Sequence, residues 1–448
     1  MRGWIIGLLL LALAAAPVTG AGGEALEPLT LEEAIQIAME GNRQLDIASA
    51  SADAAEQSSV EARSHLVPRV DLIEDFSWTT NPVYVFGNLL GQESFTAANF
   101  DIGFLNQPDS LTNFRTQVMV SQPVYTGGKI RSGVDAARAG RDAAESDRER
   151  TRQQVVHQVL DAYTGAVLAE RYREVAGESL KTSQAHEKLV ADMYQAGLVV
   201  ESDLLQVQVR RTEIEEMVIR AESAAAVSMA GLNMVMGEPM GKVYALSALC
   251  DSGACKVEDE EALEVLVNEA RAGRPDLKAS ALKAEAASLM IREARSGGRP
   301  EVGVSGIYEA NAEDFIGADG TNWSVMAHAR LRLFGGKEVR AKVARSEAEH
   351  RMALSASELM GQSVELEVRT AFHELKAARK RIEQAGMAVG LAGASLVMVE
   401  DRYREGLTTL VELMEAETAL TSARTREVQA RRDLLLADAT LKLAIGRL

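Results

Sequence analysis

The chain has 448 residues, a formal net charge of −17 and an ordinary share of charged residues, 25%. This composition excludes a disordered chain, and the acidic balance excludes nucleic acid as a partner because phosphate binding needs basic patches. Thirteen of the twenty aromatic residues fall within positions 76–125 and 308–334, and these two windows contain the segments predicted below as strands.

Residues 1–21 are predicted to be a secretory signal peptide. A basic residue, Arg2, precedes an apolar run from Trp4 to Ala16, and small residues follow at positions 19–21, which is the usual order in such signals. A membrane anchor is the alternative, although the apolar run is short for a span. No cysteine lies directly after the cleavage region, so the sequence does not indicate lipidation of the mature N-terminus.

The first structural repeat is predicted over residues 22–237, and it begins with two helices. Thr30 and Glu33 form a capping box that starts a short helix ending at Gly41. A second helix is expected over about 44–65, since a proline follows shortly after it.

A β-hairpin is predicted over about 69–125, with its strands joined by a long loop rich in Gly, Asn and Pro. After a glycine pair, a long helical hairpin is expected over 129–236. Its first helix would continue to about residue 196, a rod of roughly 100 Å, far longer than the helices of compact domains. A turn at Gly197 then leads into the returning helix.

The second half repeats this order over residues 261–448, which predicts an internal duplication. The sequence Glu-Ala-Arg-Ser at 61–64 recurs unchanged 232 positions later. A second β-hairpin is expected over about 300–334. A second long helical hairpin follows over 337–446, with its turn at Gly406.

Residues 238–260 are predicted to bridge the two repeats, and they contain the only two cysteines, Cys250 and Cys255. In an exported protein a small disulfide between them is the leading prediction, with a pair of free thiols as the alternative. A metal site would need further ligands, and no histidine lies nearby in the sequence.

The last predicted strand gives the clearest membrane signal. From Trp323 to Leu333, apolar residues at odd positions alternate with mostly polar residues at even positions, as in a transmembrane barrel strand with lipid outside and water inside. A half-buried sheet of a soluble protein has the same alternation, so this strand alone leaves both open. Four strands cannot close a barrel, and open edges cannot stay in lipid. Strands from several copies of the chain are therefore expected to pool into one barrel.

With these features in this order, the chain resembles the TolC-like outer-membrane efflux and secretion channel family. The resemblance covers nearly everything after the signal and rests on short motifs. They are Leu29-Thr30-Leu31-Glu32-Glu33-Ala34, Ser121-Gln122-Pro123, Gly127-Gly128, Tyr194-Gln195-Ala196-Gly197-Leu198 and Tyr403-Arg404-Glu405-Gly406-Leu407. Each motif is weak alone, and their order and duplication carry the identification.

The resemblance implies a mainly α fold with a β-barrel contribution, built from duplicated halves of a strand hairpin and long helices. Three copies would form a twelve-stranded transmembrane β-barrel, four strands per chain, on a twelve-helix periplasmic tunnel. The implied location is the outer membrane of a Gram-negative bacterium, and outer-membrane lipid is an implied partner.

The implied function is a passive exit duct for efflux or type I secretion. A periplasmic adaptor protein would open the duct, and an inner-membrane pump would energise it. The resemblance leaves open whether the pump is of the RND, ABC or MFS type. It also leaves open whether the cargo is a drug, a metal ion or a protein.

The same resemblance assigns roles to residues near the two helical turns. The turns match the tips that contact the adaptor, namely Gly197, Leu198, Gly406 and Leu407. Asp203 and Tyr403 match positions that latch neighbouring tip helices in the closed state. Thr408 stands where the family has a basic latch partner, so the latch is expected to be weaker or to use Arg402 or Arg404.

Glu412 and Glu415 match the acidic positions of the family's pore constriction. They are three residues apart and share one helix face, so three copies would form two stacked anionic rings. Without the resemblance, each carboxylate would be interpreted as part of a solvated helix face.

No enzymatic activity, cofactor or metal is predicted. The glycine pair before Lys129 does not form a phosphate loop, because Pro123 and Ile130 stand where Gly and Ser or Thr are required. The six histidines are scattered without the spacing of a zinc hydrolase. The alternative to a channel is a soluble periplasmic coiled-coil scaffold or adaptor, which would need no lipid-facing strands.

Overall fold

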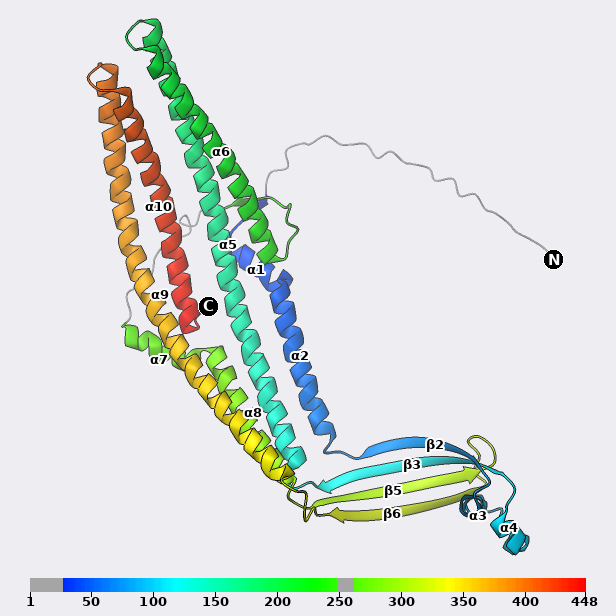
Figure 1. Ribbon diagram of the computed structural model, residues 1–448. Helices are drawn as coiled ribbons and strands as arrows, with labels where there is room; N and C mark the ends of the chain where they lie inside the picture. Colours follow the sequence, from blue (N-terminus) through cyan, green and yellow to red (C-terminus); the bar gives the residue numbers. More distant parts are fainter. Residues whose placement is uncertain (1–26, 248–261) are drawn as a thin grey trace, which may run out of the picture.

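The computed structural model describes residues 27–247 and 262–448. The predicted signal peptide and the proposed disulfide between Cys250 and Cys255 lie outside the described residues. Long helices lie alongside one another over most of the length of the molecule, and one sheet extends sideways from the end opposite the helical tips (Figure 1).

The main helices and the long strands follow the same order twice along the chain. The first half contains β1 (Glu27–Leu29), α1 (Leu31–Gly41), α2 (Arg43–Ser64), β2 (Arg69–Thr79), α3 (Pro82–Gly91), a 3₁₀ turn (Ala97–Phe100), α4 (Ile102–Asn106), β3 (Leu111–Tyr125), α5 (Lys129–Gln195), α6 (Glu201–Met236) and β4 (Tyr244–Leu246). The second half contains α7 (Leu263–Gly273), α8 (Pro275–Ser296), β5 (Glu301–Ala312), β6 (Gly320–Arg330), α9 (Glu338–Arg404) and α10 (Leu410–Ile445).

Corresponding helices of the two halves have equal lengths. The pair α1 and α7 has 11 residues each, α2 and α8 have 22, α5 and α9 have 67, and α6 and α10 have 36. The predicted duplication is therefore confirmed. The predicted capping box is present as well, since the Glu33 N–H donates to Thr30 Oγ1 (3.2 Å) and the Thr30 N–H donates to the Glu33 carboxylate (2.8 Å).

Each half pairs one continuous long helix with a split helix of similar length. In Figure 1, α2 continues the line of α6, and α8 lies beyond the C-terminal end of α10. At the first junction, Gly237 ends α6 with a φ of 79°. A Cβ at Gly237 would overlap the Gly41 carbonyl oxygen at the end of α1, so this approach requires glycine for both conformation and space.

A buried side-chain donor completes each junction. Asn42 Nδ2 donates to the Val235 carbonyl oxygen (2.7 Å), and Arg274 Nη1 donates to the Ala444 carbonyl oxygen (3.0 Å). Asn42 is 5% exposed and Arg274 is 3% exposed. Both donors satisfy carbonyl groups in the last turn of a helix, which have no partner within that helix.

Arg274 also anchors an ionic network between α8 and α9. It pairs with Asp276 (2.6 Å) and Glu367 (2.5 Å). Burial lowers the pKa of Arg274, but the bonds to these two carboxylates outweigh burial and raise it. The guanidinium is therefore held in its charged form at the centre of the second junction.

The four long strands form one antiparallel sheet in the order β2-β3-β5-β6. One row of paired residues crosses all four strands on the same face, namely Leu72, Val118, Tyr308 and Trp323. All four side chains are exposed, by 74%, 38%, 52% and 74% in that order. This face of the sheet is mainly apolar, and the row has no cover within the described chain.

The opposite face of the sheet is polar. The neighbouring row contains Gln117, Glu309 and Asn322. Gln117 Nε2 and Asn322 Nδ2 each donate to the Glu309 carboxylate at 2.8 Å. The strand alternation predicted from the sequence is thus confirmed as two chemically distinct faces. The outer strands β2 and β6 each have one edge without a strand partner among the described residues.

The segment between β2 and β3 differs from the predicted long loop. It contains α3, a 3₁₀ turn and α4. Asn81 caps α3 and Pro82 occupies its first turn, so the Asn and Pro typical of loops here start a helix. Gln92 Nε2 then donates to Asn113 Oδ1 on the polar face of the sheet (2.9 Å), and α3 covers the end of that face.

Two further details differ from the expectations, and one adds to them. The second hairpin is shorter than predicted, because β6 ends at Arg330. The short strands β1 and β4, which pair in parallel, were not predicted. Within the described residues, α9 contains a stretch long and apolar enough to cross a membrane, and none of that stretch is buried.

Candidate functional site

The two long helical hairpins end in turns of the same geometry. Gly197 and Gly406 have φ values of 72° and 70°, a conformation that favours glycine. The Leu198 N–H donates to Met193 O (2.9 Å), as the Leu407 N–H does to Arg402 O (2.8 Å), which closes each helix with a Schellman-type cap.

The predicted adaptor-contact residues lie at these turns, at the same end of the molecule (Figure 1). Leu198 is 70% exposed and Leu407 is 68% exposed. These two apolar side chains are thus exposed at the end of the long helices that is opposite the sheet.

A small hydrophobic core lies just below the turns and joins the two hairpins. Its buried members are Val190, Val207, Tyr403, Leu410 and Leu413. This core places α5 and α6 of the first hairpin against α9 and α10 of the second. The tips are therefore held together by apolar contacts within one chain.

The predicted latch residues Asp203 and Tyr403 come close together without a hydrogen bond between them. Tyr403 is 4% exposed, and its hydroxyl has no hydrogen-bond partner within the described chain. Burial raises the pKa of Tyr403, and the charge of Asp203 raises it further. Tyr403 is thus part of the core below the tips.

The predicted constriction residues Glu412 and Glu415 are both exposed on α10. Thr408 Oγ1 donates to the Glu412 carboxylate one turn away, and Thr409 caps the start of α10 by accepting from the Glu412 N–H (3.4 Å). Thr408, the residue before the N-cap of α10, therefore binds Glu412 in the first turn of that helix.

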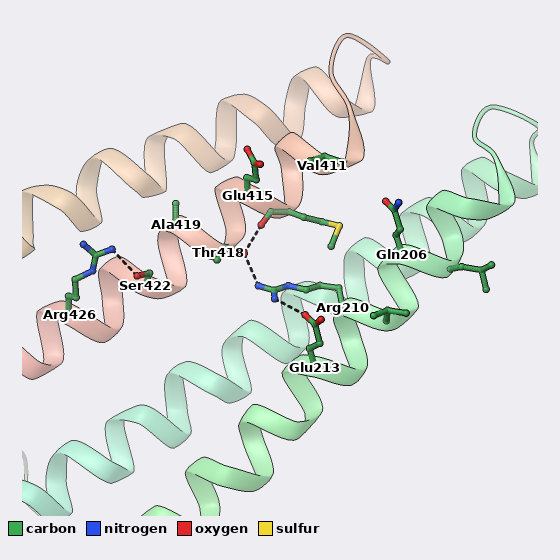
Figure 2. A pocket seen from close by; sticks show the side chains of 12 residues that line it. Gln206, Arg210, Glu213, Val411, Glu415, Thr418, Ala419, Ser422 and Arg426 are labelled. Carbon is green, nitrogen blue, oxygen red and sulfur yellow. Dashed lines mark hydrogen bonds and ion pairs between the residues drawn. The ribbon is translucent and has the colours of Figure 1, made fainter.

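Glu415 lies at the rim of an open groove of about 850 Å³ between α6 and α10. Figure 2 shows Arg210 reaching from α6 across this groove. Arg210 Nη2 donates to Thr418 Oγ1 (2.7 Å), and Nη1 pairs with Glu213 (3.0 Å). One polar bridge therefore crosses an otherwise mainly apolar groove close to the tips.

Sequence reasoning missed a buried ionic cluster one helical turn below the tip core. His186 on α5 lies against the Glu417 carboxylate on α10, and its Nε2 is 3.7 Å from Glu400 Oε1 on α9. The His186 side chain is 9% exposed and that of Glu417 is 10% exposed. The only sequence signal is that His186 follows Ser183 and precedes Val190 on the buried face of α5.

The chain is similar in sequence to known proteins. The sequence model described as outer membrane efflux protein matches residues 34–238 and 266–447. Protein CyaE of Bordetella pertussis is 27% identical over 345 residues, which cover 76% of this chain and 72% of that protein. The pyoverdine export outer membrane protein OpmQ of Pseudomonas putida is 22% identical, with 93% and 85% covered.

The fold is also that of a solved channel structure. A crystal structure of CusC, described with its transmembrane channel formation, matches with a TM-score of 0.80 at 17% identity. The match covers 93% of this chain and 91% of that chain. It includes both the sheet and the long helices.

Proposed function

The chain belongs to the outer membrane efflux protein family, and from that premise we propose that three copies assemble into a closed exit duct gated at the helical tips. Its location in the outer membrane, with the helices in the periplasm, and its role as an efflux or secretion duct follow from the family. The family consists of passive channels, which excludes an enzyme and the soluble scaffold considered above.

The observation that carries the proposal is the incomplete sheet. Its apolar face is exposed across all four strands, and β2 and β6 leave two free edges. In hydrocarbon each unpaired backbone group costs several kcal/mol, so β6 of one copy would pair with β2 of the next. Three four-stranded sheets would close a barrel with the apolar face toward lipid and the polar face toward water.

An adaptor and an inner-membrane pump are the partners that this duct would need. Leu198 and Leu407 are exposed at the two turns, and nothing within the described chain covers them. We therefore assign the turns at Gly197 and Gly406 to adaptor contact. The name of OpmQ refers to pyoverdine export; the cargo of this chain depends on its own pump.

Glu412 and Glu415 would form the constriction. Both carboxylates are exposed near the tips, and three copies would place six of them around one axis. Such rings attract cations and hinder the passage of anions. Movement of the hairpins at Gly197 and Gly406 would widen this ring.

The test is conductance in planar lipid bilayers. Replacement of both glutamates by alanine, Glu412→Ala with Glu415→Ala, should raise the single-channel conductance and weaken block by divalent cations. Glu358→Ala, an exposed change on α9 far from the tips, is the matched control and should change neither. Unchanged conductance and block in the double variant would remove the constriction assignment.

A further inference from the structure

Several polar pairs join α5 to α10 along the interface between the two hairpins. In order toward the tips, these are His157 with Thr440 (3.0 Å), Asp161 with Arg432 (2.5 Å), Tyr172 with Gln429 (2.9 Å) and Ser179 with Thr421 (3.2 Å). Polar pairs exchange readily with water, so such an interface separates at lower cost than an apolar one. His186 and Glu417 form the next pair toward the tips.

This last pair is the buried one beside the tip core. His186 is one turn from Val190, and Glu417 is one turn from Leu413, both members of that core. Opening of the tips between the hairpins would have to separate His186 from Glu417. Their contact therefore bears directly on the gate.

The neighbouring arginines bind other groups, so Glu417 depends on His186 for a positively charged partner. On α9, Glu400 has its own cation, because Arg404 Nη2 is 2.6 Å from its carboxylate. On α6, Arg210 binds Thr418 and Glu213, and Arg211 pairs with Glu187 (3.0 Å) and Glu215 (2.9 Å). None of the ion pairs found among the described residues joins Glu417 to an arginine or lysine.

A buried carboxylate without a cation is strongly unfavourable, whereas a carboxylate beside an imidazolium is stabilised. We propose that the His186–Glu417–Glu400 cluster is a proton-dependent latch that holds the two hairpins together at the tips. With the imidazole protonated, one cation lies between two carboxylates and the tips stay packed. After loss of the proton, Glu417 gains by contact with water, which favours separation of the hairpins.

The direction of the pH effect follows from His186. Burial lowers its pKa, but the close contact with the Glu417 carboxylate and the charges of Glu417 and Glu400 outweigh burial and raise the pKa above its ordinary value. A group whose pKa is raised by folding stabilises the packed state below its ordinary pKa and loses that contribution as pH rises through the raised value. The latch is therefore closed on the acid side and released on the alkaline side.

This inference rests on the proposed channel function, and its main test is conductance between about pH 5 and pH 9. The unmodified channel should conduct poorly at acid pH and several-fold better at alkaline pH. His186→Gln should conduct well throughout, because the cation is absent at every pH. Glu417→Gln, which keeps the histidine, should make the conductance less dependent on pH. His157→Gln, in the polar interface nearer the sheet, is the control and should keep it.

A second measurement separates failure of the latch from failure of the channel. Imidazole NMR titration of the detergent-solubilised protein should give His186 a pKa above the ordinary value, lowered by about one unit in Glu417→Gln. A conductance of His186→Gln that still depends on pH would overturn the latch. An ordinary pKa for His186 that does not change in Glu417→Gln would overturn it as well. If no conductance appears at all, the channel proposal fails while the titration still reports on the cluster.

Discussion

Asn42 and Arg274 occupy equivalent positions of the two halves, 232 residues apart, and bind equivalent carbonyl groups by different chemistry. The neutral amide of Asn42 needs only hydrogen bonds, and it donates to Val235 O and accepts from the Gln44 N–H. The buried guanidinium of Arg274 needs charged partners as well, and Asp276 and Glu367 provide them. The second junction is therefore the one that depends on charge.

Arg274→Ala should destabilise the helical part by about 3 kcal/mol, because the change leaves the Ala444 carbonyl group without its buried donor and leaves Asp276 with only the longer contact to Arg150 (3.5 Å). Arg43→Ala is the matched control: its side chain is 87% exposed and, among the described residues, pairs only with Asp46 on its own helix, so it should cost less than about 1 kcal/mol. Denaturant unfolding followed by helical circular dichroism measures both. Equal effects of the two changes would contradict the assigned role of the junction.

At the scale of elements, local signals predicted the long helices well. A glycine with positive φ ends α6 and α10, the capping box starts α1, and uninterrupted helix-forming sequence fills α5 and α9. These signals lie within a few residues of what they determine. The helix α3 was missed because its Asn and Pro occur in loops as often as at helix starts.

Long-range contacts could not be predicted in the same way. His186 and Glu417 are 231 residues apart in the sequence, and only the packing of α5 against α10 brings them together. Arg274 and its partner Glu367 are also distant in the sequence, and the packing of α8 against α9 brings them together. The roles of Glu412 and Glu415 were assigned only through a family resemblance, because exposed glutamates carry no distinctive local pattern.

The helix α3 provides a prediction at the scale of elements. It lies on the polar face of the sheet near the end away from the helices, held by Gln92 on Asn113 and by Asn88 on Ser77 (3.4 Å). In a closed barrel that face lines the lumen, so three copies of α3 would narrow the outer mouth.

Replacement of residues 82–106 by a short turn should therefore raise the conductance, most clearly in the channel already opened by His186→Gln. The assembly should persist, because the strand ladder does not depend on α3. Val83→Ser, at an α3 side chain that is 77% exposed, is the control for a change in composition alone. A conductance that is unchanged by the deletion would show that α3 does not obstruct the mouth.

The whole molecule exposes two apolar surfaces that a single chain cannot cover. One is the sheet face with Leu72, Tyr308 and Trp323, and the other is the uncovered apolar stretch of α9. Contiguous exposed apolar surfaces mark interfaces with lipid or protein. In a trimer, lipid would cover the apolar sheet face and a sister copy would cover the apolar stretch of α9. One assembly would therefore account for both surfaces.

Native mass spectrometry of the purified mature protein, released from detergent micelles, tests this account most directly. The account predicts one species with three times the mass of the mature chain, which precipitates when the detergent is removed. A stable monomer that stays in solution without detergent would contradict it, because the free edges of β2 and β6 and the apolar sheet face would then need no partner.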